Sequence, residues 1–119
     1  MEKVNLAEKF ALFDDYFSPR VVGELNGQMV KLVKQKGDFV WHKHDQEDEL
    51  FLVVKGRLKI RFRDRDVDLD AGEFFIIPRG VEHQPVAEHE VHVLLFEPAS
   101  TLNRGDVRNE KTVEQLKRI

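Results

Sequence analysis

Short segments with the pattern of β-strands follow one another closely along most of this 119-residue chain. They are rich in β-branched and aromatic residues, and turn-forming residues separate them. This spacing is typical of an all-β barrel or jelly roll. The predicted strands cover residues 28–34, 39–44, 50–54, 57–63, 67–69, 73–77, 83–86 and 91–97.

Capping-box patterns predict a short helix near each end of the chain. The first pattern covers residues 5–8, and the second covers residues 112–115 and predicts a helix ending near Ile119. We find no repeat, linker or low-complexity segment, so we expect residues 1–119 to form a single domain with its core at about 28–97.

Composition excludes several classes of protein. There are no cysteines, so disulfides, thiolate metal sites and cysteine nucleophiles are absent. A formal net charge of −3 gives no overall attraction to nucleic acid. No apolar stretch approaches the length of a membrane span, and the start of the chain lacks a signal-peptide pattern. We therefore expect a cytoplasmic protein that binds neither membrane nor nucleic acid.

One predicted strand carries a basic stripe at every second position. Between its cations stand the apolar residues Leu58, Ile60 and Phe62, which indicates a strand with one buried and one solvated face. Four aspartates follow at residues 64–70, so we interpret the stripe as a solvated face with cross-strand ion pairs rather than a nucleic-acid surface. The stripe consists of Arg57, Lys59, Arg61, Arg63 and Arg65.

Two histidines separated by one residue, His42 and His44, are the first candidates for a metal site. Side chains alternate between faces in an extended strand, so the two imidazoles point the same way about 7 Å apart. Glu49 follows His44 at an odd offset and reaches the same face only if the chain turns within the all-polar stretch 45–48. Without that turn, Asp48 would be the ligand instead.

A third histidine, His83, joins this group from much later in the chain. It follows a proline–glycine turn signal at 78–80, which closes the apolar run 74–77. Three neutral imidazoles and one carboxylate suit a divalent first-row metal (Fe, Mn, Ni or Zn) and leave positions open for water or substrate. We therefore predict one divalent transition metal held by His42, His44, Glu49 and His83.

The candidate ligands stand in two patterns that resemble the two motifs of the cupin superfamily. The first pattern is His42-x-His44, four residues, Glu49, six residues and Gly56, and the second is Gly72, five residues, Pro78-x-Gly80, two residues and His83. Fifteen residues, 57–71, separate the patterns, as in compact single-domain cupins, and the resemblance covers about residues 37–96.

The chain departs from the usual cupin pattern in two places, and neither departure removes a ligand. Gly37 is one residue closer to the first histidine than usual, and Ala87 replaces the asparagine that often ends the second motif. The second change affects the hydrogen bonding near the site.

The resemblance implies a double-stranded β-helix, the jelly-roll barrel of cupins, and it points to small cupins described as mannose-6-phosphate isomerase-like. Small cupins commonly dimerise, which agrees with strands 50–54, 74–77 and 91–96, because they are apolar on both faces and need a cover outside the barrel. The cover is a second subunit, giving a homodimer, or the chain's own N-terminal segment with Phe10, Phe13, Tyr16 and Phe17.

Face alternation also predicts what surrounds the metal. It places Val40, Phe51 and Val53 beside the ligands, and it turns Trp41 and Lys43 outward. We expect Gln84 and Arg79 near the mouth of the barrel, where they could contact a polar or anionic substrate, although Arg79 also fits a solvated turn.

Two further histidines are weaker candidates. His89 lies in a polar turn at 88–90, so we expect it to be exposed. His92 alternates with Val91 and Val93 in a strand, and a partly buried residue with its own partner is favoured over a position lining the cavity.

Two functions remain open. The first is a metal-dependent enzyme that acts on a small oxygen-rich molecule, sugar-like or carboxylated, by isomerase- or dioxygenase-type chemistry. In that case Glu49 could leave the metal and serve as a general base, although its default role is that of a ligand. The second is a non-catalytic module that binds or senses a small ligand or a metal, since a fold alone does not fix a function.

Overall fold

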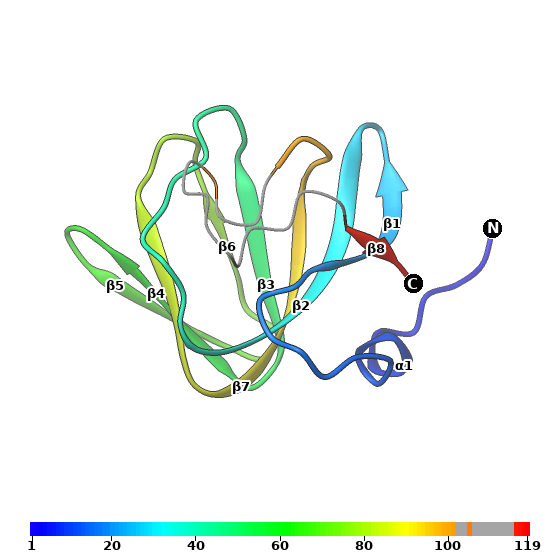
Figure 1. Cartoon of the computed structure of the whole chain (residues 1–119). Helices are drawn as coiled ribbons and strands as arrows, with labels where there is room; N and C mark the ends of the chain where they lie inside the picture. Colours follow the sequence, from blue (N-terminus) through cyan, green and yellow to red (C-terminus); the bar gives the residue numbers. More distant parts are fainter. Residues whose placement is uncertain (102–104, 106–115) are drawn as a thin grey trace.

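A computed structural model describes residues 1–101, 105 and 116–119 of the chain. The described elements form an all-β jelly roll with one short helix, as the sequence predicted (Figure 1). In chain order they are α1 (Leu6–Phe10), β1 (Arg20–Leu25), β2 (Gln28–Asp38), β3 (Glu49–Lys55), β4 (Arg57–Phe62), β5 (Asp66–Asp70), β6 (Phe74–Ile77), β7 (His83–Pro98) and β8 (Lys117–Arg118).

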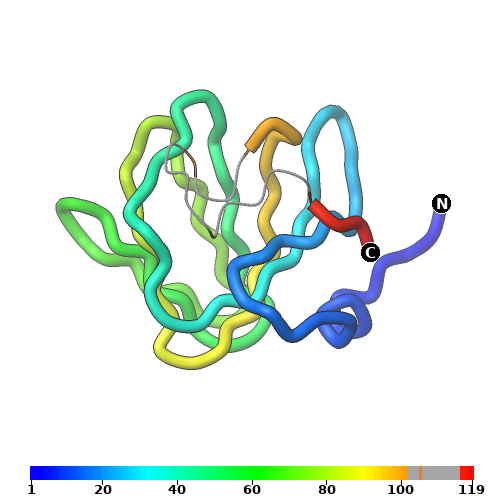
Figure 2. Tube along the Cα trace, viewed as in Figure 1, coloured from blue at the N-terminus to red at the C-terminus, as the bar shows by residue number. Residues whose placement is uncertain are grey.

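The two longest strands, β2 and β7, pair with each other and run through both halves of the barrel (Figure 2). The first part of β7 pairs with β4, and its last part pairs with β3. Between these parts the register of β2 and β7 shifts near Gly37, whose φ of 81° favours glycine. The sequence predicted two separate strands, 83–86 and 91–97, and this was wrong, because a bent strand keeps its pairing through the bend.

Both ends of the chain differ from the prediction. Strand β1, which pairs with β2, was not predicted. The second capping box, at 112–115, lies outside the described residues. Its helix was expected to end near Ile119, but Lys117–Arg118 instead form β8, which pairs in parallel with β1. The helix at the other end is confirmed, since Asn5 accepts a hydrogen bond from the backbone N–H of Glu8 at 3.0 Å.

The N-terminal segment packs against the outside of the barrel. Phe10 and Phe13 form a second apolar cluster with Leu32, against which Val54 and Leu94 also pack. His92 lies in this cover as well, where its ring stacks on Phe10 at 4.5 Å and its Nε2 bonds to Glu90 at 2.8 Å. His92 is thus a partly buried residue with its own partners, as favoured from the sequence, and His89 is exposed as expected, although it lies in β7 rather than in a turn.

The basic stripe forms the expected ion pairs. In the β4–β5 ladder, Arg57 lies opposite Asp70 and 3.3 Å from a carboxylate oxygen of Asp68, and Arg61 is 3.8 Å from Asp66. These pairs occupy the solvated face that the alternation predicted. In the part of the chain that the structure describes, no helix has the length and apolar character needed to cross a membrane.

Candidate metal centre

The first two candidate ligands lie on the segment between β2 and β3. The predicted strand 39–44 is reduced to a single antiparallel bridge, in which His42 and His83 exchange backbone hydrogen bonds of 3.0 and 2.9 Å. This bridge joins the two parts of the candidate site, which are 41 positions apart in the chain. Glu49 is the first residue of β3, and the expected turn before it is present as a bend at residues 45–46.

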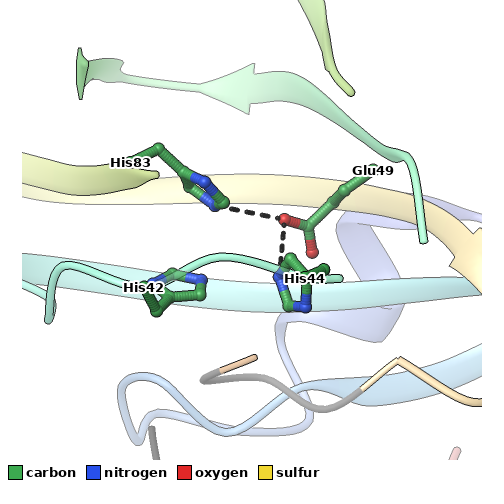
Figure 3. A group of neighbouring side chains, drawn as sticks. All are labelled: His42, His44, Glu49 and His83. Carbon is green, nitrogen blue, oxygen red and sulfur yellow. Dashed lines mark ion pairs between the residues drawn. The ribbon is translucent and has the colours of Figure 1, made fainter. Parts of the chain in front are cut away.

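The structure brings the four predicted residues together inside the barrel (Figure 3). All four are buried, and one potential ligand atom from each lies within 4.8 Å of those of the others. Oε1 of Glu49 is 3.3 Å from Nε2 of His44 and 3.6 Å from Nε2 of His83. The rings of His42 and His83 are the closest pair among the three histidines, with centroids 4.3 Å apart.

Backbone carbonyls fix the orientation of two of these rings. Nδ1 of His42 donates to the carbonyl oxygen of Val40, and Nδ1 of His83 donates to that of Val81, both at 2.9 Å. A proton on Nδ1 leaves the lone pair on Nε2, the atom that faces the other candidate ligands. Such outer hydrogen bonds are typical of histidines that bind metals.

Unpartnered polar atoms test whether the four residues fit a cation. Both ring nitrogens of His44, Oε1 of Glu49 and Nε2 of His83 are buried without a hydrogen-bond partner in the described part of the chain. Buried polar atoms usually find partners, because leaving them without one costs free energy. One cation among the four residues would satisfy the atoms that face it, so this set could hold a metal ion.

The protonation states suit the same role. Burial, with the neighbouring His83, lowers the pKa of His42 to about 4, so its imidazole is neutral at pH 7. Burial alone would raise the pKa of Glu49, but its close neighbours Glu97, His44 and His83 outweigh this effect and hold the pKa well below its ordinary value. Glu49 is therefore a carboxylate, the ionised form that a metal requires.

Comparison with known proteins identifies the family. Residues 28–97 match the family described as cupin domain, which is more than half of the chain. The chain is a cupin. The same residues include both sequence patterns and all four candidate ligands of this cupin.

Several proteins resemble this cupin over much of its length. A cupin-2 domain protein from Shewanella frigidimarina NCIMB 400 has 48% identity and a TM-score of 0.79, covering 80% of this chain and 93% of that one. Protein NMB1881 from Neisseria meningitidis has 29% identity and a TM-score of 0.76, covering 82% and 100%. The uncharacterised protein YdbB of Bacillus subtilis (strain 168) is 38% identical over 64 residues, which span 53% of this chain and 57% of YdbB.

A buried ion pair beside the site of this cupin was missed from the sequence. Nζ of Lys31 lies 2.9 Å from Oε1 of Glu97, and each residue has only 1% of its surface exposed. Burial, the Glu49 carboxylate and the hydrogen bond to it raise the pKa of Glu97 well above its ordinary value. The sequence carried a signal for this pair. Strand alternation puts Lys31 on the same face as Val33 and Glu97 on the same face as Leu95, and Val33 and Leu95 are buried.

Two residues expected at the mouth of the barrel have structural partners instead. Arg79 is bound to Asp48, which accepts its backbone N–H at 2.9 Å and its Nε at 3.3 Å. Gln84 is buried and donates to the carbonyl oxygen of Phe39 at 3.0 Å, so its expected substrate contact is corrected to a contact within the fold. Of the residues expected beside the ligands, Phe51 and Val53 are buried in the core, whereas Val40 is half-buried and holds the ring of His42 through its carbonyl.

Amide replacement of the two neighbouring acids, Glu49 and Asp48, should show which of them binds the metal. We expect Glu49→Gln to weaken metal binding by about 100-fold, because the amide keeps an oxygen in place but lacks the charge of the carboxylate ligand. Asp48→Asn should change the affinity less than about twofold, because Asp48 is exposed and paired with Arg79. Titration of metal-free protein with zinc, monitored by calorimetry, measures both. Equal losses would contradict the assignment of Glu49.

Proposed function

We propose that this cupin binds one divalent transition metal (Fe, Mn, Ni or Zn) through His42, His44, Glu49 and His83 and uses it in an enzymatic reaction on a small molecule with oxygen donors. The observation that carries the proposal is the convergence of four buried donor residues, three of which have polar atoms without a hydrogen-bond partner in the described part of the chain. Isomerase-type and dioxygenase-type chemistry both agree with this ligand set.

A bound metal would supply a Lewis acid for a substrate oxygen or, as iron or manganese, a redox centre. The residues of the chain do the remaining work. Val40 and Val81 hold two rings in the tautomer that presents Nε2. Phe51 and Leu95 line the adjoining pocket and limit the access of water to it. Glu49 completes the ligand set, and on leaving the metal it would be the base nearest to a bound substrate.

A second candidate function is a non-catalytic module that binds a small ligand or the metal itself. The observation in its favour is the scarcity of polar side chains around the pocket. Apart from His42 and Glu49, Gln35 is the one residue with a polar side chain among the described residues that line it. Few groups are therefore available to move protons independently of the metal.

Metal analysis and a substrate screen test these alternatives. Protein purified without chelators should contain close to one metal ion per chain, with Fe, Mn, Ni and Zn measured by mass spectrometry. The four metal forms are then mixed under air with sugar phosphates, uronates, diketones and phenols. Turnover supports the enzyme, whereas a saturable thermal shift without turnover supports the binding module. Protein that neither contains nor takes up any of the four metals contradicts the enzyme, and it contradicts the binding module too if no compound shifts its melting temperature.

We also propose that two copies associate through the outer face of β6 and its neighbour β3. Phe74 and Ile76 on β6 are 58% and 54% exposed, and they lie opposite Leu52 and Leu50 of β3. The N-terminal segment packs on another part of the same outer face, against Leu94 and Val54. A second copy would cover the apolar residues that remain outside the barrel.

Light scattering tests this association. The unaltered chain should have the mass of a dimer at micromolar concentration, and Phe74→Glu should give a monomer, because burying an unpaired carboxylate in an apolar interface is unfavourable. Leu12→Glu is the matched control, since Leu12 is also exposed but lies in the N-terminal segment. A monomeric mass for the unaltered chain would end the proposal.

A further inference from the structure

A small pocket adjoins the candidate metal centre on the inside of the barrel. His42 and Glu49 form one part of its wall, so a ligand in the pocket would lie next to the metal. The rest of the wall is mainly apolar and includes three aromatic residues, Phe17, Phe39 and Phe51. The pocket therefore belongs to the same site and restricts what that site can accept.

The wall of the pocket does not suit a sugar phosphate. No lysine or arginine is among the described residues that line it, so a phosphate would have no cationic partner apart from the metal. The many hydroxyls of a sugar would face carbon atoms and lose their hydrogen bonds with water. An apolar, planar molecule would instead pack against the aromatic rings.

One polar group in the wall has no partner. Gln35 is 6% exposed, and its Oε1 is buried without a hydrogen bond in the described part of the chain. Gln35 lies on β2 and lines the same pocket as Glu49. An unpartnered buried acceptor indicates that a ligand would supply the missing donor.

Two stacked rings form part of the pocket wall. Phe17 and Phe39 have ring centroids 4.9 Å apart and planes inclined by 18°. The free volume is about 20 Å³, room for one water molecule, so a larger ligand requires a side chain to move. Phe17 is the half-buried member of the pair, and its φ of 59° is unusual for a residue with a side chain. A hydrogen bond of 2.9 Å from its backbone N–H to the carbonyl oxygen of Lys34 holds this conformation.

We propose that the pocket binds a small hydroxylated aromatic molecule of the catechol class. One hydroxyl oxygen faces the metal centre, a second hydroxyl donates to Oε1 of Gln35, and the ring packs between Phe39 and Phe51 after the side chain of Phe17 moves aside. This inference rests on the proposed metal function and narrows its substrate from oxygen-rich molecules in general to planar, mainly apolar ones.

Binding to the zinc form tests the inference without any need for turnover, because zinc is redox-inert. Catechol, toluene and mannose 6-phosphate are titrated by calorimetry. Catechol should bind more tightly than toluene, and mannose 6-phosphate should not bind. Gln35→Leu should weaken catechol binding by roughly tenfold, since the ligand hydroxyl loses its acceptor, and should leave toluene binding unchanged. Phe17→Ala should increase the association rate constant of catechol.

Two outcomes would overturn the inference but not the proposed metal function. In the first, the chain binds zinc but the zinc form binds mannose 6-phosphate more tightly than catechol. In the second, Gln35→Leu weakens the binding of catechol and of toluene equally. If Gln35→Leu does not fold, the comparison of catechol with toluene on the unaltered chain decides, and equal affinities reject the role of Gln35. Failure of the chain to bind zinc at all would overturn the proposed function together with the inference, and calorimetry with zinc alone detects it beforehand.

Discussion

Replacing His44 with alanine is expected to weaken metal binding by at least about 100-fold. Loss of a residue that only supports a ligand typically costs 10- to 100-fold in affinity, so loss of a ligand itself should cost more. His44 is a buried member of the group, 3.3 Å from Glu49, and two of its nitrogens lack other partners in the described structure. Competition with a chromophoric chelator measures the affinity.

The fold should survive this change. His44 is not among the apolar residues of the main core, which includes Leu58, Ile60, Val91 and Val93. The metal-free His44→Ala variant should therefore give the circular dichroism spectrum of the unaltered metal-free protein. Lys43→Ala is a suitable control on the same segment, because the side chain of Lys43 is 39% exposed and its Nζ pairs with Asp45 at 3.3 Å. If both variants bind metal equally, His44 is not a ligand.

The same variant separates the two proposed functions. In an enzyme that uses the metal, His44→Ala should abolish any turnover found with the unaltered chain. In a binding module there is no turnover to lose, and the change should appear only in ligand affinity. Turnover that persists in the metal-free variant would refute metal catalysis.

The candidate site was largely predictable because its chemistry is recorded in residue types and spacing. His42 and His44 are near one another in sequence, and the polar stretch before Glu49 marked the bend that returns the chain to the inside of the barrel. The distant His83 followed a recognisable turn, and the structure joins it to His42 through a two-residue bridge. These are local signals, which a sequence carries without knowledge of the sheet order.

The features of the fold that were not predicted depend on pairing between strands far apart in the sequence, which local patterns do not record. The bend in β7 and the added strand β1 exist because both pair with β2. Phe17 was one candidate for an outer cover, yet it lines the pocket and stacks on Phe39. Alternation puts Lys31 and Gln35 on the face of Val33, and the closure of the barrel makes this face the inner one.

The second large effect concerns stability. Glu97→Leu is expected to reduce the free energy of unfolding by about 3–5 kcal/mol, because it leaves the ammonium of Lys31 buried without the side-chain oxygen to which it donates. Lys31 is almost fully buried, and in the described part of the chain it also donates to the carbonyl oxygen of Thr101 at 3.3 Å. Urea denaturation of the metal-free protein measures the loss.

A double replacement distinguishes the lost pair from a general packing defect. In Lys31→Met with Glu97→Leu, both charges are absent and apolar side chains of similar volume fill the space, so stability should return close to that of the unaltered chain. If the double variant is as unstable as the sum of the two single variants, the residues act independently and the 2.9 Å contact contributes little. Recovery would instead show that this pair is coupled inside the barrel. Because Glu97 helps to lower the pKa of Glu49, its loss should also weaken zinc binding by about tenfold. A zinc affinity that stays unchanged in Glu97→Leu would separate the stability role from any role in holding the ligand.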